Sequence, residues 1–157
     1  MTSKTQNDRR DWRAQEMLLL QQVIRNLGRD DGAHDTALYI MLQLMSEFFG
    51  LNQGRIVLQH LNDENASIRH AYGMSPEQTA RGVYAPGEGI TGTVLKHAHM
   101  IVADNVRDDP LFLGRSVLHS DIPAEQTMFI ALPVTAHNRT FGVLACLVII
   151  TIPAGIA

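Results

Sequence analysis

The chain has 157 residues, enough for one domain with a proper hydrophobic core. Its net charge is −3 and its isoelectric point about 6.1, so no basic surface for direct nucleic-acid contact is expected. The single cysteine, Cys146, excludes a disulfide framework, a zinc knuckle and a C-x-x-C redox pair. The sequence shows neither a secretory signal nor an apolar run long enough to span a bilayer, so we expect a cytoplasmic protein without membrane contact.

The first part of the chain predicts a tail and two helices. Residues 1–12 are polar, and we expect them to be disordered. The second of the two expected helices, at residues 33–49, is amphipathic and ends at Gly50. The first, from about residue 12 to 27, carries an apolar stripe at 3-4-3 spacing, made of Met17, Leu20, Ile24 and Leu27. Two heptads do not decide whether this stripe is buried within the domain or forms a homodimer interface.

The rest of the chain predicts strands. A turn at 62–65 separates two runs that indicate an antiparallel hairpin, and Ser75-Pro76 begins a short helical turn. The expected strands are 55–61, 67–72, 100–103, 127–136 and 139–149, and one helical turn is expected within 110–114. The last two strands flank the turn His137-Asn138 and are apolar on both faces, so a layer should cover each face. The helices supply one layer, and residues 74–123 supply the other, where a small-molecule cavity is expected.

The glycine run at residues 86–92 (P-G-E-G-I-T-G) matches the dinucleotide-binding pattern G-x-G-x-x-G. A dinucleotide site also needs a buried parallel strand before the glycines and a long helix after them. Here Pro86 ends a short strand at 82–85, and the following helix is short, at about 91–97. We therefore expect Gly87 and Gly89 to turn the chain into this helix and Gly92 to allow close packing on the sheet. Glu88 should lie at the positive end of the helix.

The order of these motifs resembles the GAF domain family. Two helices and a hairpin precede P-G-E-G-I-T-G-T-V-L, I-V-A-D-N and D-D-P-L-F-L, and a late hairpin ends in F-G-V-L-A. Within that family the chain is most similar to the N-terminal regulatory domains of NifA-type, sigma-54-dependent, enhancer-binding transcriptional activators, which act in nitrogen fixation. The resemblance covers about residues 15–150. It departs from the family at 151–157, an apolar tail with proline and glycine where a C-terminal helix is usual.

The resemblance implies a three-layer α/β (α+β) sandwich with a central, mainly antiparallel sheet of about six strands. The domain should span residues 13–150. Its implied function is non-catalytic: it senses a small ligand and forms a homodimer, and the N-terminal helices relay the state of the ligand. The implied effector is a small carboxylate such as 2-oxoglutarate, or a cyclic nucleotide. A regulatory protein partner is also implied by the resemblance.

Six side chains are the candidates for such a ligand site. Arg107 and Arg115 flank the D-D-P-L-F-L segment, and a carboxylate in a partly dry cavity needs a guanidinium. The alternative is that both arginines pair with nearby surface carboxylates. Four further residues are polar groups for an apolar cavity wall, with ordinary packing as the alternative: Tyr72, Tyr84, His119 and Thr127.

Two other function classes remain open from the sequence. One is a dimerisation or protein-docking module without a ligand, and the other is a nucleotide-binding or redox enzyme. No catalytic residues are predicted, because no G-x-S-x-G motif is present. No metal site is predicted, since His97 and His99 do not share a face and lack neighbouring ligands.

Overall fold

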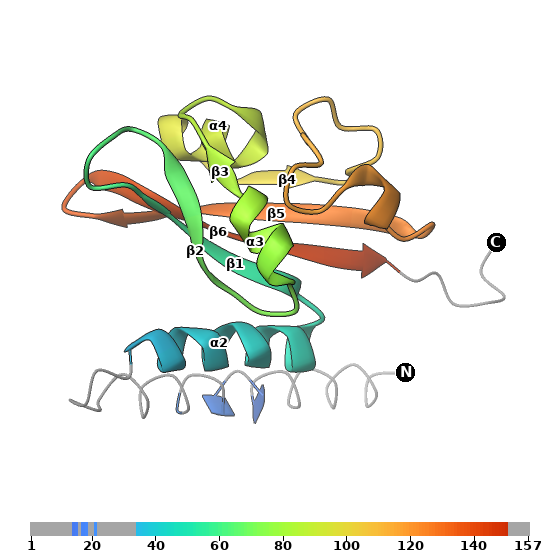
Figure 1. Ribbon diagram of the computed structural model, residues 1–157. Coiled ribbons are helices and arrows are strands. Elements are labelled where there is room, and N and C mark those ends of the chain that lie inside the picture. The colour runs from blue at the N-terminus through green and yellow to red at the C-terminus, as the bar shows by residue number, and fades with distance from the viewer. Residues whose placement is uncertain (1–13, 16, 19–20, 22–33, 151–157) are drawn as a thin grey trace, which may run out of the picture.

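The computed structural model describes residues 14–15, 17–18, 21 and 34–150, and shows a layered α+β domain (Figure 1). The expected tails at 1–12 and 151–157 lie outside the described residues. So does most of the expected first helix, of which the five described residues are helical. Within the described part, a helix lies on one side of a central sheet, and shorter helices and loops lie on the other.

The central sheet has six strands in the order β3-β2-β1-β6-β5-β4, and every neighbouring pair is antiparallel. The strands are β1 (Asn52–Gln59), β2 (Ala66–Ala71), β3 (Val83–Tyr84), β4 (Ile101–Ala103), β5 (Gln126–Ala136) and β6 (Arg139–Ile150). The predicted fold class and strand number are confirmed. The strand boundaries differ from those predicted by at most three residues, which is usual for element ends.

The long β5–β6 hairpin lies between β1 and β4 in the sheet and depends on its two-residue turn. His137 and Asn138 have φ values of 51° and 60°. Two successive left-handed residues give the type of turn whose twist matches that of the flanking strands. The pairing then runs from Ala136 opposite Arg139 to Gln126 opposite Ile150, so the predicted hairpin is confirmed.

Helix α2 (His34–Phe49) covers the β1–β2 half of one sheet face. Leu42 is fully buried there. A Cβ atom on Gly54 of β1 would lie only 3.0 Å from Leu42 Cδ2, so glycine lets the helix approach the sheet. Gly50 ends the helix in the left-handed conformation (φ 65°), as predicted.

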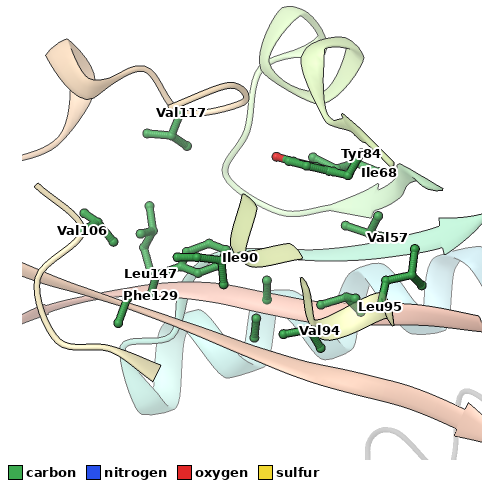
Figure 2. Close-up of a cluster of buried hydrophobic side chains, with 14 of the residues drawn as sticks. Val57, Ile68, Tyr84, Ile90, Val94, Leu95, Val106, Val117, Phe129 and Leu147 are labelled. Atoms are coloured by element: carbon green, nitrogen blue, oxygen red, sulfur yellow. The ribbon is translucent and has the colours of Figure 1, made fainter. Parts of the chain in front are cut away.

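Two short helices belong to the opposite face. Helix α3 (Pro76–Arg81) begins with a complete capping box between Ser75 and Gln78, which confirms the predicted helical start. Helix α4 (Gly89–His97) packs on β5 and β6. The main hydrophobic core lies under α4 and residues 104–125, as Figure 2 shows around Ile90, Val94 and Phe129.

The segment 104–125 crosses the sheet mostly without regular structure. The helical turn expected within 110–114 is not a helix. A single turn closes one residue earlier, where the Phe112 N–H donates to the Asp109 carbonyl at 3.1 Å. The one short helix of the segment is the 3-10 turn η1 (His119–Asp121). Among the described helices, none is long and apolar enough to cross a membrane.

Candidate functional site

A cavity of about 20 Å³ lies between the sheet, the start of α4 and the loop at residues 111–117. We call this loop the lid. Side chains from β1, β3, α4 and β5 contribute to the cavity wall together with the lid. The lining residues are Arg55, Tyr84, Ile90, Thr91, Phe129 and the lid residues 111–117.

The glycine run shapes one wall of this cavity. Gly87 and Gly89 have φ values of 82° and 65°, conformations that only glycine adopts without strain, and they turn the chain into α4. A Cβ on Gly92 would lie 2.2 Å from the Ala85 carbonyl oxygen, so Gly92 packs on the turn before the helix, not on the sheet as expected. The Ile90 N–H donates to the Leu111 carbonyl at 3.1 Å and so joins α4 to the lid.

Arg55 on β1 is the most unusual residue of the cavity. Its side chain is 3% exposed, and its guanidinium carbon lies 5.5 Å from the centre of the Phe129 ring. Nε donates to the Gln53 carbonyl at 3.2 Å, but Nη2 has no hydrogen-bond partner. Burial lowers the pKa of Arg55 from its ordinary value, although a guanidinium remains charged in proteins.

No carboxylate of the described residues pairs with Arg55. The ion pairs found there are His60–Asp63, His70–Asp35 and Arg115–Glu88. A buried charge without a counter-ion is expensive, and most proteins avoid it. Arg55 is therefore the residue of this cavity whose buried charge a bound anion would stabilise most.

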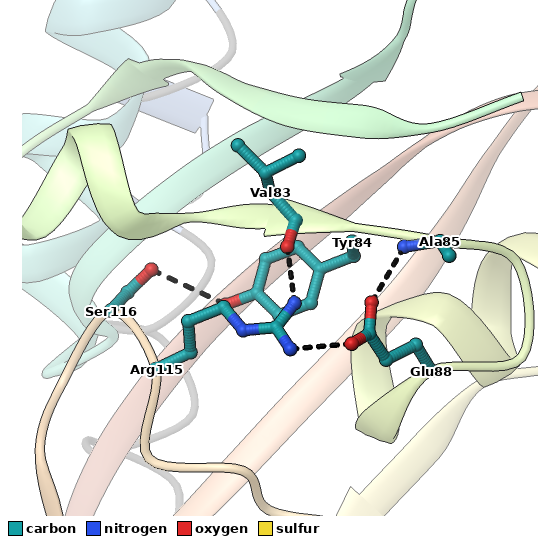
Figure 3. Close-up of polar contacts among 6 residues, drawn as sticks. All are labelled: Val83, Tyr84, Ala85, Glu88, Arg115 and Ser116. Carbon is teal, nitrogen blue, oxygen red and sulfur yellow. Dashed lines mark hydrogen bonds and ion pairs between the residues drawn. The ribbon is translucent and has the colours of Figure 1, made fainter. Parts of the chain in front are cut away.

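Arg115 lies at the rim of the cavity and is already neutralised (Figure 3). One of its nitrogens lies 2.5 Å from Glu88 Oε1, and another donates to the Val83 carbonyl. Glu88 also accepts from the Ala85 N–H at 2.9 Å. The hydrogen bond from Arg115, with help from the Ala85 N–H, lowers the pKa of Glu88 to about 2. The pair connects the lid to the start of α4.

The lid is held by two more contacts near Arg115. The Tyr84 hydroxyl lies 3.3 Å from Ser116 Oγ, and both side chains are buried. Arg81 of α3 donates to the Arg115 carbonyl and to the Ser116 carbonyl, both at 3.0 Å. These contacts close the lid over the cavity.

The structure brings two of the six predicted ligand residues, Tyr84 and Arg115, to this cavity. Tyr72 lies elsewhere, with its ring packed edge-on against Tyr39 of α2 at 5.5 Å. Arg107 donates to the Ile122 carbonyl at 2.7 Å and to the Pro123 carbonyl at 2.6 Å, so it holds the loop itself.

The remaining two predicted residues lie near the lid but do not line the cavity. The ring of His119 packs edge-on against Phe112 at 5.5 Å. Thr127 is fully buried and lines a second cavity of about 220 Å³. Val117 borders both cavities, so it separates the second cavity from the first.

Sequence reasoning missed Arg55, Thr91 and Ser116 as cavity residues. An arginine at the start of a strand usually lies exposed, and alternation alone does not show which face is inward. The signal that identifies the face is the pairing of Arg55 with Ala145 and of Val57 with Val143, which places Arg55 on the core side. That pairing is not visible from the local sequence.

Two other reactive side chains, Cys146 and His60, have surroundings that suit structural roles. Cys146 is buried, and burial raises its pKa, which suits a packing role. His60 lies 2.9 Å from both Asp63 Oδ1 and Ser67 Oγ, in the order of a Ser-His-Asp triad. Asp63 also accepts from the Asn65 N–H at 2.8 Å, so this cluster closes the β1–β2 turn. In the described ranges, no three His, Cys, Asp or Glu residues are grouped to hold a metal.

Comparison with known proteins identifies the family. A family model described as the GAF domain matches residues 33–148. The nitrogen fixation protein AnfA of Azotobacter vinelandii is 32% identical over 109 residues, which cover 69% of this chain and 20% of that protein. The Nif-specific regulatory protein of Klebsiella pneumoniae is 34% identical over 138 residues, which cover 84% of this chain and 25% of that protein. The chain thus spans a quarter or less of these relatives.

Solved structures confirm the fold. The nlh2 GAF domain of A. aeolicus in an inactive state has a TM-score of 0.75 at 18% identity, covering 89% of this chain and 83% of that one. The free methionine-R-sulfoxide reductase of Neisseria meningitidis has a TM-score of 0.67 at 17% identity, covering 85% and 72%. The fold thus also occurs in a reductase, whereas the relatives by sequence are a nitrogen fixation protein and a Nif-specific regulatory protein. The chain belongs to the GAF domain family and is homologous to the Nif-specific regulatory proteins.

Proposed function

We propose that this chain is the non-catalytic sensory domain of a NifA-type transcriptional activator in nitrogen fixation. It binds a small acidic effector in the cavity under the lid and forms a homodimer through the predicted helix at 12–27. Regulatory relatives by sequence support the first part of this proposal. A regulatory role is also consistent with a general property of such domains: a bound ligand can shift the protein from one packed conformation to another.

One observation carries the ligand-binding part: the buried Arg55, with Nη2 unpartnered among the described residues, lines the cavity under the lid. In a domain that bound nothing there, only the Phe129 ring and the Gln53 carbonyl would offset the cost of burying this cation. A ligand with a carboxylate or a phosphate would supply the missing counter-charge and acceptor.

The size of the cavity determines how such a ligand enters. A volume of about 20 Å³ is close to the space of one or two water molecules. Both effectors implied by the resemblance, 2-oxoglutarate and a cyclic nucleotide, are larger, so they require the lid to move outward. Movement of the lid breaks the Arg115–Glu88 contact and so changes the packing at the start of α4. This is the proposed first step of the signal.

The experiment is native mass spectrometry of the purified chain combined with hydrogen exchange. We expect a dimer with a small acidic molecule bound to it. This molecule either co-purifies with the chain or is added as 2-oxoglutarate, acetate or cyclic AMP. The bound ligand should change amide exchange in 104–123 and leave the β5–β6 turn unchanged, which serves as internal control. Unchanged exchange in 104–123 with every ligand at saturation would refute ligand sensing.

The small volume of the cavity favours a second candidate function, docking of a regulatory protein without a small ligand. Such a module needs no room for a ligand, and the cavity under the lid has space for only one or two water molecules. Absence of any bound small molecule, together with an intact dimer, would support this candidate.

A further inference from the structure

We propose that the second cavity, of about 220 Å³, is a separate binding site for an uncharged ring compound that carries one hydroxyl or N–H group. The hydroxyl or N–H group of this compound donates a hydrogen bond to Gln53 Oε1. The site is independent of the proposed acidic effector under the lid, because Val117 is the one described residue that lines both cavities.

The second cavity lies where β1 and β5 begin and β6 ends. Part of its wall comes from these strands, including Gln53, Thr127 and Leu147, and another part comes from the loop at 117–123. Arg107 donates to the Ile122 carbonyl at 2.7 Å and to the Pro123 carbonyl at 2.6 Å, so this loop is held in place. The cavity therefore exists before a ligand binds, as is usual for small-molecule sites.

The first argument is an acceptor of the cavity wall that lacks a donor. Gln53 Oε1 is buried and has no hydrogen-bond partner among the described residues. Two neighbouring groups of the wall cannot donate to it: the Thr127 hydroxyl donates to the Glu125 carbonyl at 3.1 Å, and the ionised carboxylate of Asp121 only accepts. A buried acceptor without a donor is costly, so a ligand that donates to Gln53 stabilises the folded chain.

The second argument is the irregular backbone at Gln53. Asn52 pairs with Leu147 but Arg55 pairs with Ala145, so β1 contains one residue more than β6 between these pairs. Such bulges redirect a side chain and are frequent beside binding sites. Gln53 also has a φ of 48°, a left-handed conformation that costs free energy for a residue other than glycine. Strain of this kind is concentrated at functional sites, which supports a binding role for Gln53.

The third argument is the charge and size of the second cavity. No lysine, arginine or histidine of the described residues lines it, and its one charged residue is Asp121, so an anion is disfavoured. Four side chains supply apolar wall: Val117, Pro123, Leu147 and Ile149. An apolar cavity of roughly 150 Å³ binds benzene, so about 220 Å³ accommodates one substituted ring. A ring with a single donor uses Gln53 and leaves no polar group of its own unpaired.

Phenol and toluene are the main probes, because they have nearly the same size and shape and differ in the hydroxyl donor. The native chain should bind phenol more tightly than toluene, since the hydroxyl group satisfies Gln53 Oε1. A purely apolar cavity would show the opposite order, because phenol would lose its hydrogen bonds to water. Benzamide should likewise bind more tightly than benzoate, which has the same shape but a negative charge and no donor. Isothermal titration calorimetry of the full chain with millimolar ligand measures all four affinities.

Two variants locate the site. Gln53→Met removes the acceptor and keeps a side chain of similar length on the same strained backbone. The ratio of phenol to toluene affinity should fall at least about fivefold, so that toluene becomes the preferred ligand. Ile149→Trp fills the cavity from its wall and should abolish the binding of both probes. Gln43 of α2 bonds to Glu47 and lines neither cavity, so Gln43→Met is the matched control and should bind both probes as the native chain does.

The proposed site is wrong if the native chain binds toluene more tightly than phenol, binds benzoate more tightly than benzamide, or does not bind phenol at all. It is also wrong if Gln53→Met leaves the ratio of phenol to toluene affinity unchanged. Unchanged phenol binding by Ile149→Trp would show that phenol binds outside the second cavity. Circular dichroism reports whether each variant is folded, and if Ile149→Trp is not, the comparison of Gln53→Met with Gln43→Met decides.

Discussion

At the residue scale, the site contains two arginines in opposite electrostatic surroundings. Arg55 is buried without a counter-ion, whereas Arg115 at the rim is paired with Glu88. Sequence reasoning identified Arg115 because it flanks a recognisable motif. It missed Arg55 because the meaning of a charged residue in a strand depends on which strands lie beside it. Local sequence therefore indicates the rim of the site but not its base.

The pH dependence of stability offers a test of the Glu88–Arg115 pair. The folded state lowers the pKa of Glu88 from 4.5 to about 2. A depressed carboxyl pKa stabilises the fold above the unfolded pKa, and this stability is lost as the pH falls from about 5 to about 2. The Arg115 and Glu88 side chains are 32% and 38% exposed, so the contribution of the pair should be small and should decrease with salt.

Denaturant unfolding of the native chain and of Glu88→Gln at pH 7, 5, 4 and 3 measures this contribution. The native chain should be the more stable at pH 7, and the difference should shrink toward pH 3. Glu125→Gln, at an exposed position, serves as the control. A difference that stays constant with pH would show that Glu88 does not act through its charge.

At the scale of elements, the sequence predicted most strands and helices because their periodicity and turn residues are local signals. The His137-Asn138 turn and the Ser75 capping box are examples, and both are confirmed. The segment 104–125 was less predictable. Its 3-10 turn lies at 119–121, between carbonyl groups held by side chains distant in sequence: Arg81 bonds to the carbonyls before the turn and Arg107 to those after it. Contacts of this kind are not encoded in any short window.

The turn between β3 and α4 makes a prediction about Gly92. Glycine to alanine within a helix normally stabilises a protein by about 0.5–1 kcal/mol. Here the new Cβ would lie 2.2 Å from the Ala85 carbonyl oxygen, which belongs to the backbone and cannot turn aside. Gly92→Ala should therefore reverse the usual sign and destabilise the fold by about 1–3 kcal/mol.

Thermal and denaturant unfolding of Gly92→Ala measure this sign. Lys96→Ala, at an exposed position of the same helix, is the control for helix propensity and should change stability little. A stabilised Gly92→Ala would mean that the turn before α4 is less tightly packed than the structure shows.

At the scale of the whole molecule, the two faces of the sheet are covered by different elements. One face carries α4, the lid and the cavity, and the other carries α2. Arg55 and Ala145 point to the cavity side, while Gly54 meets Leu42 of α2. A change at the cavity must therefore cross the sheet to reach α2. Strand β1 can couple the two layers, because it contributes Arg55 to the cavity and contacts α2 on its other face.

Homodimer formation through the N-terminal stripe is the corresponding prediction for the assembly. Of the four stripe residues, Met17 lies in the described part and is 59% exposed in the single chain, so it is available to a partner. Burial of a leucine or isoleucine side chain contributes about 1.5–3 kcal/mol, and a carboxylate in its place adds a desolvation cost. Leu20→Glu combined with Ile24→Glu should therefore convert a dimer into a monomer.

Native mass spectrometry and light scattering of the double variant measure the oligomeric state. Gln21→Glu adds a negative charge to the same helix at an exposed position, so it should leave the dimer intact. If both variants remain dimeric, the stripe is not the interface. If the unmodified chain is a monomer at every concentration, the stripe forms no homodimer interface, and the signal from the cavity must leave the domain by a route other than a partner copy.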